Sequence, residues 1–264
     1  MPEPLVSIIV TTKNSERTFD KCLESIKNQS YKNIELIVVD NNSTDRTKEI
    51  AHKYTDAVFN LGPERSPQRN FAARQAKGEY LLINDSDIYF NHDSVKECVA
   101  LIERDKCDAI ILPEQSIGTG FWAKVKAFER SFYVGNDYIE AARFFKKDKF
   151  LAVGGYDENL YAGEDWDLTI RLRRAGGKIS RANIFVEHDE GRLKLFDSSS
   201  KKKYYSVNFF EIYAKKHPME FKKQMSFLVR FPLNKIAQKG FRHPILFSSM
   251  IFMKGLELFN SVKK

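Results

Sequence analysis

Residues 34–45 read IELIVVDNNSTD, a short apolar run that ends at an aspartate and turns directly into polar residues. A run of this length, rich in β-branched residues, is typical of a strand that is buried on both faces. Ser43 then stands where we expect it to cap a helix from Thr44 to about Tyr54. The stretch therefore predicts a strand, a short loop and a helix, with Asp40 at the end of the strand.

The same alternation of apolar runs and amphipathic segments continues on both sides of this stretch. The other predicted elements are strands at 6–12, 57–60 and 80–84 and helices at 15–29 and about 67–76. Strands that alternate with helices at this interval predict a parallel, doubly wound α/β sheet. In such sheets ligands bind beyond the carboxyl ends of the strands, where Thr12, Asp40 and Asp85 fall.

Two carboxylates one residue apart follow the apolar run at 80–84, in Asp85-Ser86-Asp87. Both can turn toward one divalent cation and leave its other positions to phosphate oxygens. Taken alone, the Asp-x-Asp pattern is also typical of a solvated turn. Further motifs follow it along the chain, namely GGYDE at 154–158, GEDWD at 163–167 and then His188.

The order and spacing of these motifs, over residues 5 to about 190, resemble the family 2 glycosyltransferases of GT-A fold. The resemblance implies a doubly wound, mixed but mainly parallel sheet. It also implies a metal-dependent enzyme that moves a hexose from a UDP- or GDP-linked sugar to an acceptor hydroxyl or phosphate. We expect this transfer to be a step of glycan or glycolipid assembly.

The resemblance assigns the binding of the sugar nucleotide to residues near the strand ends. Asp40 matches the aspartate that accepts from the nucleobase, and a carboxylate suits the ring N–H of uracil or guanine; an ordinary strand-to-helix turn is the other interpretation. Each guanidinium group of Arg65 and Arg69 can donate two hydrogen bonds to phosphate oxygens. A solvated helix start also explains one arginine. The other implied donor-binding residues are Thr11, Thr12, Asn14, Asn42, Asn70, Asp85, Ser86 and Gly155.

The resemblance also implies a site for Mn²⁺ or Mg²⁺. Asp87 matches a direct ligand, Asp85 contacts the ribose or a metal-bound water and is the weaker candidate ligand, and His188 matches a third ligand. One imidazole beside carboxylate oxygens favours Mn²⁺ over Mg²⁺. A lone histidine is otherwise usually an ordinary core or surface residue.

The catalytic carboxylate is expected at Asp165, which matches the position of the general base in the resembling family. Its neighbour Glu164 is the other catalytic candidate. Acidic residues at a helix start are also explained by the helix dipole. If Asp165 takes the proton of the acceptor, the reaction inverts the anomeric centre; if it only orients the sugar, retention stays open.

The C-terminal part differs sharply from the rest in charge. The chain of 264 residues carries a net charge of +8; residues 200–264 hold 14 Lys and Arg against 3 Glu, which is +11, so the rest carries −3. We therefore expect a catalytic domain over 1–198 and a basic, amphipathic helical extension over 199–264. Basic, aromatic helices of this kind bind anionic membrane surfaces, and such binding would hold the active site beside a lipid-linked acceptor. A solvated helical cap on the catalytic domain is the alternative. No recognised nucleic-acid motif accompanies the charge, so no nucleic-acid partner is expected.

Compartment is indicated by the cysteines and the N-terminus. The three cysteines are unevenly spaced and form neither a disulfide framework nor a zinc motif, which favours a reducing compartment. The first residues lack a basic stretch and a long apolar run, so we expect no signal peptide. The longest apolar stretch, 244–253, is shorter than the ~20 residues that cross a membrane. We expect a cytoplasmic protein, peripheral at the cytoplasmic face of the membrane.

Two other classes of protein remain open. A nucleotidyltransferase also uses a doubly wound sheet and paired aspartates, but it needs a glycine-rich phosphate loop after the first strand. Residues 11–15 read TTKNS and contain no glycine. A non-catalytic protein that binds a membrane surface or nucleic acid is supported by the basic extension alone, and the acidic residues at every matching motif argue against it.

Overall fold

The structure is a computed structural model that describes residues 3–193, 205 and 208–262. It divides into two compact units. The first comprises Met1–Pro113 and Ala141–Glu187, and the second Glu114–Glu140 and His188–Lys264. The predicted domain boundary between residues 198 and 199 lies outside the described residues and stays a prediction.

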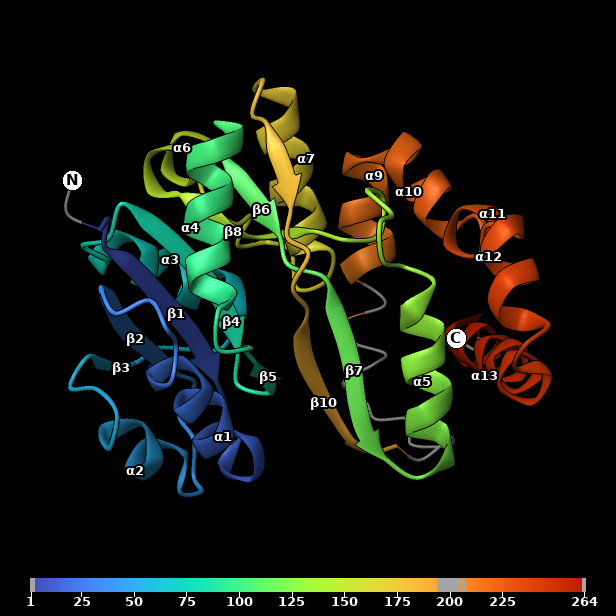
Figure 1. The fold of residues 1–264 in the computed structure, drawn as a ribbon, viewed down its shortest axis with the longest axis horizontal. Coiled ribbons are helices and arrows are strands. Elements are labelled where there is room, and N and C mark those ends of the chain that lie inside the picture. Colours follow the sequence, from blue (N-terminus) through green and yellow to red (C-terminus); the bar gives the residue numbers. More distant parts are fainter. Residues whose placement is uncertain (1–2, 194–204, 206–207, 263–264) are drawn as a thin grey trace. The chain divides into compact units, whose positions relative to one another are not determined.

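The first unit is built on a seven-stranded sheet of order β3-β2-β1-β4-β8-β6-β9 (Figure 1). Its strands are β1 (Val6–Thr12), β2 (Ile34–Asp40), β3 (Val58–Asn60), β4 (Tyr80–Asp85), β6 (Ala109–Ile111), β8 (Ala142–Lys146) and β9 (Ile179–Arg181). Strands β3, β2, β1 and β4 are parallel, β8 runs antiparallel to β4 and to β6, and β6 is parallel to β9. The predicted α/β class with a mixed, mainly parallel sheet is confirmed.

Helices connect these strands. They are α1 (Glu16–Lys27), α2 (Thr47–His52), α3 (Arg65–Gln75), α4 (Ser94–Asp105), α6 (Lys147–Ala152) and α7 (Glu164–Arg174), and a short β5 (Ile88–Tyr89) follows β4. The expectation that Ser43 caps a helix from Thr44 was wrong. Helix α2 begins at Thr47, whose N–H donates to Asp45 Oδ1 over 3.0 Å, while Ser43 Oγ accepts from the N–H of Asn14 over 2.8 Å.

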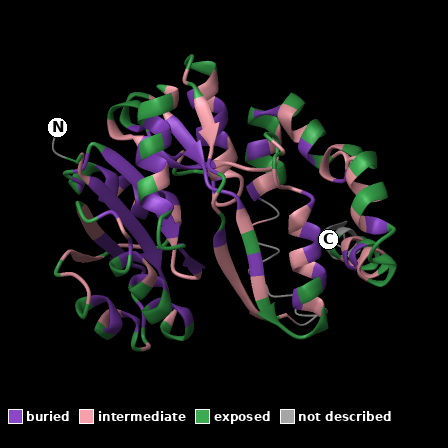
Figure 2. Ribbon diagram, viewed as in Figure 1, coloured by how far each residue is buried: buried purple, intermediate pink, exposed green. Residues whose placement is uncertain are grey.

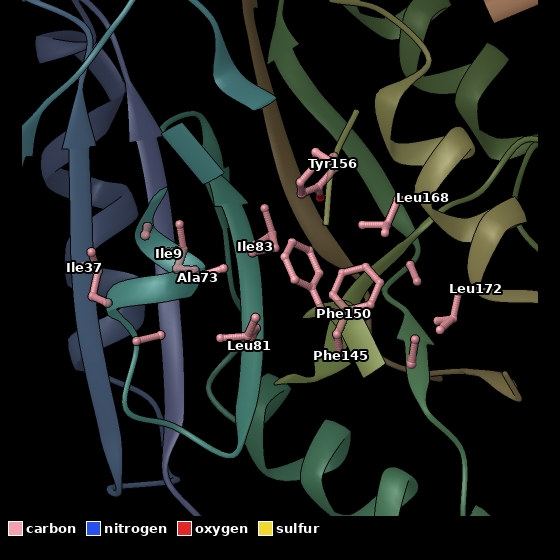
Figure 3. Packing of buried hydrophobic residues seen from close by; sticks show 14 of the residues in the cluster. Ile9, Ile37, Ala73, Leu81, Ile83, Phe145, Phe150, Tyr156, Leu168 and Leu172 are labelled. Atoms are coloured by element: carbon pink, nitrogen blue, oxygen red, sulfur yellow. The ribbon is translucent and has the colours of Figure 1, made fainter. Parts of the chain in front are cut away.

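The core of the first unit explains why its strands are continuously apolar. All seven residues of β1 are buried, because helices cover both faces of the sheet (Figure 2). One cluster packs side chains of β1, β2 and β4 against α3 and continues through Phe145 and Phe150 to Leu168 and Leu172 of α7 (Figure 3). Burial of each such side chain contributes about 1.5–3 kcal/mol, and it anchors α3 and α7, the helices that carry the site.

The second unit contains β7 (Glu114–Thr119), the later part of β10 (Val186–Arg192) and helix α5 (Phe121–Ser131). The helical C-terminal segments follow as η1 (Phe209–Tyr213), α9 (Ala214–Lys216), α10 (Pro218–Met225), α11 (Phe227–Arg230), α12 (Leu233–Lys235), η2 (Ile236–Gly240) and α13 (Pro244–Val262). Met250 and Met253 of α13 pack on Val125 and Phe128 of α5. None of the helices in the described ranges has the length and apolar character needed to cross a membrane.

Candidate active site

The carboxyl ends of β1, β2 and β4 bring three predicted positions to one edge of the sheet. Thr12 pairs in register with Asp40 of β2, and Thr11 pairs with Asp85 of β4. Hydrophobic packing sets this register, because a shift of one residue would turn every buried side chain to the opposite face. The edge therefore presents hydroxyl and carboxylate groups from three neighbouring strands.

Buried polar atoms without a partner mark this edge. Asp40 is 1% exposed, and its Oδ2 accepts from the Ser43 N–H over 2.7 Å and lies 3.8 Å from Lys48 Nζ. Its Oδ1, like the hydroxyls of Thr11 and Thr12, has no hydrogen-bond partner within the described chain. An unsatisfied buried acceptor costs about 1–3 kcal/mol, so these atoms are suited to receive hydrogen bonds from a ligand.

Asn14, Asn42 and Ser86 shape the loops around the strand ends. Asn14 and Asn42 have φ values of 48° and 51°, a left-handed conformation that asparagine tolerates better than most residues. Asn14 Oδ1 accepts from the Thr44 N–H over 2.9 Å, and Asn42 Oδ1 accepts from Asn60 Nδ2 over 2.6 Å. Ser86 Oγ lies 2.8 Å from the hydroxyl oxygen of Ser15. These side chains tie neighbouring loops together, and their predicted contact with the donor stays a prediction.

Arg69 of α3 joins the carboxylates of the site. Its side chain is fully buried, and its Nη2 donates to Asp85 Oδ1 over 2.7 Å. Its Nη1 lies 3.1 Å from Asp165 Oδ1 and 3.3 Å from Glu164 Oε1, and the guanidinium stacks 5.0 Å from the centroid of the Tyr156 ring. One guanidinium thus holds together the end of β4 and the first turn of α7. Its predicted contact with donor phosphates stays a prediction.

Arg65 and Arg143 complete a cluster of three arginines and three carboxylates. Arg65 Nη2 lies 3.2 Å from Glu164 Oε1, and Arg143 Nη1 lies 3.4 Å from Asp85 Oδ2. Burial raises the pKa of Asp85, but the charges of Arg69 and Arg143 outweigh it and hold that pKa well below its usual range. The pKa of Glu164 is raised by burial and by the neighbouring charge of Asp165. The network therefore keeps Asp85 ionised, whereas Glu164 gains a proton more readily than an exposed glutamate does.

Asp165 is the more accessible of the two catalytic candidates. Its side chain is 29% exposed, whereas that of Glu164 is 5% exposed and faces Arg65 and Arg69. A base must lie within hydrogen-bond reach of the proton that it takes. This geometry favours Asp165 for contact with an acceptor and Glu164 for holding the arginines.

Arg143 belongs to the site although none of the sequence motifs predicts it. It stands in the apolar strand β8, which reads ARFFK, and its side chain is largely buried. An arginine inside a buried strand is the one signal that points to it, because a buried charge needs a partner of opposite charge. Its partner, Asp85, lies 58 residues earlier in the chain, so the pairing is not visible in local sequence.

Asn70 holds the glycine-rich loop before α7. Its Nδ2 donates to the Tyr156 carbonyl over 2.9 Å and to Glu158 Oε1 over 3.0 Å, and its Oδ1 accepts from the Tyr156 N–H over 2.8 Å. Gly155 has a φ of +64°, and a Cβ there would lie 2.4 Å from Asn70 Oδ1. The structure thus joins two predicted donor-binding residues, with Asn70 acting on the loop backbone.

Gly155→Ala should lower the free energy of unfolding by more than the ~1–3 kcal/mol that a left-handed alanine costs, because the new methyl group also displaces Asn70. Gly154→Ala is the matched control, since Gly154 has a φ of +84° and open space around its Cβ position. Urea denaturation of both variants measures the difference. Equal losses of unfolding free energy in the two variants would show that the Asn70 side chain moves aside without destabilising the fold.

The acidic residues after β4 suit a hard divalent cation, but they do not form a complete cage. Asp87 is half-buried in the turn between β4 and β5, while both oxygens of Asp85 lie within ion-pair distance of arginines. Over the described ranges, no three His, Cys, Asp or Glu side chains gather so as to hold a metal ion by themselves. A cation here would therefore bind through Asp87 together with oxygen atoms of a ligand.

His188 lies in β10, within the second unit, whereas Asp87 belongs to the first. Its Nδ1 lies 3.2 Å from Glu114 Oε2, and the same Glu114 oxygen accepts from Arg130 Nη1 over 2.5 Å. The histidine thus has a carboxylate neighbour that can orient its ring. Its role as a third metal ligand stays a prediction.

Comparison with known proteins connects this chain to a family. The family model described as "Glycosyl transferase family 2" matches residues 7–155. The poly(ribitol-phosphate) β-N-acetylglucosaminyltransferase TarS of Staphylococcus aureus is 34% identical over 121 residues, 42% of this chain and 21% of that protein. The UDP-Glc:α-D-GlcNAc-diphosphoundecaprenol β-1,3-glucosyltransferase WfaP of Escherichia coli is 36% identical over 107 residues, 39% of this chain and 43% of its own length. The chain thus spans less than half the length of these curated relatives.

Solved structures share the fold over most of the chain. A crystal structure of S. aureus TarS in complex with UDP-GlcNAc matches with a TM-score of 0.63 and 19% identity, covering 93% of this chain and 79% of that one. The mannosyltransferase PcManGT of Pyrobaculum calidifontis, in complex with GDP-Man and Mn²⁺, matches with a TM-score of 0.59 and 18% identity, covering 95% and 74%. Because the family model spans more than half of the chain, this protein belongs to glycosyl transferase family 2 and has the GT-A fold.

Proposed function

We propose that this protein is a metal-dependent glycosyltransferase that moves a hexose from a UDP- or GDP-linked donor to an acceptor hydroxyl or phosphate. The observation that carries the proposal is the gathering of Asp85, Glu164 and Asp165 around the buried Arg69. Asp85 ends β4, and Arg69 holds the first turn of α7 beside it, at the edge where doubly wound sheets bind their ligands.

The donor would bind through its base at the ends of β1 and β2. The unpartnered Asp40 Oδ1 can accept the ring N–H that uracil and guanine both offer, and Thr12, whose hydroxyl also has no partner within the described chain, pairs with Asp40 in the sheet. The TarS structure contains UDP-GlcNAc and the PcManGT structure contains GDP-Man, which supports a nucleotide of either kind.

Asp165 would act as the general base. The acceptor oxygen attacks the anomeric carbon, the bond from that carbon to the diphosphate oxygen breaks, and the nucleoside diphosphate leaves with the bonding electrons. The acceptor proton passes to the Asp165 carboxylate, whose Oδ1 is held by Arg69. Attack opposite the leaving group inverts the anomeric centre. Glu164, held by two arginines, would keep Arg65 and Arg69 in place.

Asp87 would hold Mn²⁺ or Mg²⁺ together with the diphosphate, with Asp85 beside it and His188 as a third ligand. A bound cation would offset the negative charge that develops on the leaving diphosphate. Oxygen-rich ligand sets suit both metals, and an imidazole would favour Mn²⁺. The PcManGT structure, which contains Mn²⁺, supports this assignment.

The acceptor would be lipid-linked. The name of WfaP describes a diphosphoundecaprenol-linked acceptor, and the basic C-terminal part of this chain suits the membrane surface where such lipids reside. The enzyme would then work at the cytoplasmic face of the membrane, in glycan or glycolipid assembly.

Incubation with a panel of UDP- and GDP-sugars, with and without divalent cation, tests the proposed reaction. A glycosyltransferase releases nucleoside diphosphate and free sugar slowly to water, and faster when a suitable acceptor is added. Consumption of pyrophosphate with release of nucleoside triphosphate would instead show a nucleotidyltransferase. No turnover of any sugar nucleotide, with cation and acceptor present, would refute the proposal.

Asp87→Ala should abolish transfer and cation-dependent binding of nucleoside diphosphate, because it removes the carboxylate that we assign as the direct ligand of the cation. Titration calorimetry with UDP and GDP, in Mn²⁺ and in excess EDTA, measures this loss. Asp148→Ala, which removes an exposed carboxylate of α6, is the matched control and should bind as the wild type does.

His188→Ala should raise the Mn²⁺ concentration needed for half-maximal activity. Full transfer in excess EDTA would contradict the metal assignment.

A further inference from the structure

Exposed apolar side chains are concentrated in the helical C-terminal segments. Within the described residues, the large hydrophobic side chains that are more than half exposed are Met219, Leu228, Leu233, Phe241, Ile245 and Phe252. All of them lie between the start of α10 and the middle of α13, and Phe241 is 81% exposed. In the described part of the first unit, the exposed large hydrophobics are Leu151 and Phe185, at 43% and 37%. Exposed large apolar side chains that gather on one surface mark a site that binds other molecules.

Helix α13 has two faces with different tasks. Met250 and Met253 are buried against the α5 cluster, so this face belongs to the core of the second unit. Ile245 and Phe252 are seven residues apart, which places them two turns apart on one side of the helix, away from both methionines. Ser248, exposed between them, continues the same side. The core of the unit is therefore complete without Ile245 and Phe252.

The exposed side of α13 carries no charge. Lys254 and Glu257 are the ionisable residues of Pro244–Val262, and they lie 2.8 Å apart as an ion pair. Lys254 also pairs with the buried Glu129 of α5, and this contact, together with Lys126, lowers the pKa of Glu129 to about 2 despite its burial. Lys254 thus ties α13 to α5, and Glu257 pairs with Lys254 within the helix.

The surroundings of this apolar face are basic. Residues 208–257 contain nine Lys and Arg against three Glu, a net charge of +6. Lys215, Lys222 and Arg242 are among the exposed basic side chains. An occupant must therefore offer both apolar and anionic groups. A second copy of this face would bring positive charge against positive charge, and a nucleic acid would leave the apolar side chains in water.

We propose that the segment from α10 to α13 docks on an anionic membrane surface. Phe241, Ile245 and Phe252 enter the boundary between headgroups and acyl chains, and the flanking Lys and Arg contact the lipid phosphates. The helices lie in the plane of the interface. Docking needs no sugar donor or acceptor, so its test is separate from that of the transferase activity.

Flotation of the full chain with vesicles tests the docking. Vesicles of phosphatidylcholine with about 30% phosphatidylglycerol should carry the protein at low salt, whereas vesicles of phosphatidylcholine alone should carry much less. Raising the salt from about 0.1 to about 1 M should weaken binding, because the Debye length falls from ~10 to ~3 Å. Failure of the protein to float with anionic vesicles at low salt would overturn the proposal.

Two sets of variants locate the surface. Phe241→Ser/Ile245→Ser/Phe252→Ser should weaken the apparent lipid affinity by at least about tenfold, since each loss removes inserted apolar area. Leu151→Ser/Phe185→Ser is the matched control, with exposed apolar side chains of the first unit, and should float as the wild type does. Lys215→Gln/Lys222→Gln/Arg242→Gln should weaken binding by about fivefold per charge, the equivalent of ~1 kcal/mol, and tests the surface through exposed residues if the apolar variant fails to fold by circular dichroism.

Undiminished flotation of both sets of variants would overturn the proposed surface. Light scattering tests the other possible occupant of this face, a second copy of the chain. If the wild type is a dimer that the apolar substitutions convert to a monomer, and neither protein floats, the face joins two copies of the chain and the membrane proposal is wrong.

Discussion

Asp165→Asn should reduce sugar transfer by about 10²- to 10⁴-fold, the usual cost of removing a general base, while nucleotide binding changes little. The amide keeps the size of the carboxylate and can still accept from Arg69 Nη1, which lies 3.1 Å from Oδ1 in the wild type, but it cannot take the acceptor proton. Steady-state kinetics at saturating donor measures the loss, and calorimetric titration with UDP or GDP measures binding.

Glu164→Gln is the matched control for the base assignment. It removes the neighbouring carboxylate, which is 5% exposed and paired with Arg65 and Arg69, so we expect a loss of stability with a smaller loss of turnover. If Glu164→Gln abolishes transfer while Asp165→Asn retains it, the two roles must be exchanged.

Arg69→Met should lower the free energy of unfolding at pH 7 by about 3–5 kcal/mol, the usual cost of removing one partner from buried ion pairs. Methionine fills a similar volume but leaves Asp85, Glu164 and Asp165 near one another with less positive charge between them. Chemical denaturation measures the loss. Arg74→Met, on the exposed side of the same helix, is the matched control and should stay within about 0.5 kcal/mol of the wild type.

The effect of Arg69→Met should depend on pH in a defined direction. The pKa of Asp85 is lowered in the folded wild type, so its stabilising contribution is present above the unfolded-state pKa of about 3.9 and is lost as the pH falls toward the lowered folded-state pKa. Without Arg69 much of this contribution is absent at every pH. The difference in stability between the two proteins should therefore shrink as the pH is lowered from 7 toward 3. A difference that grows on acidification would contradict the pairing of Arg69 with Asp85.

Arg69→Lys separates a positioning role from general stability. An ammonium group retains the charge but lacks the planar fork that reaches Asp85, Glu164 and Asp165 together. We expect it to recover part of the stability, with turnover at saturating donor still reduced. Wild-type turnover in this variant would show that Arg69 supports the fold without positioning Asp165.

Local sequence was sufficient for the elements of the first unit. The strands at Val6–Thr12 and Ile34–Asp40 and the helix at Glu16–Lys27 follow from apolar runs and a helical period, which are properties of neighbouring residues. It failed at Ser43, because capping depends on which donor lies nearest. The N–H of Asn14, 29 residues away, donates to the Ser43 hydroxyl, and the helix begins at Thr47.

By itself the sequence determined the α/β fold class, the family and the position of Asp40 and Asp85 at strand ends, because strand alternation and motif spacing are encoded in the order of residues. Only the tertiary structure decided that Arg69 faces Asp85, Glu164 and Asp165, that Arg143 joins them, and that Asn70 holds the glycine loop. These partners lie 16 to 96 residues apart. Burial removes their charges from water, so each must find a partner in space, and the packing of α3 and α7 on the sheet selects which partner it meets.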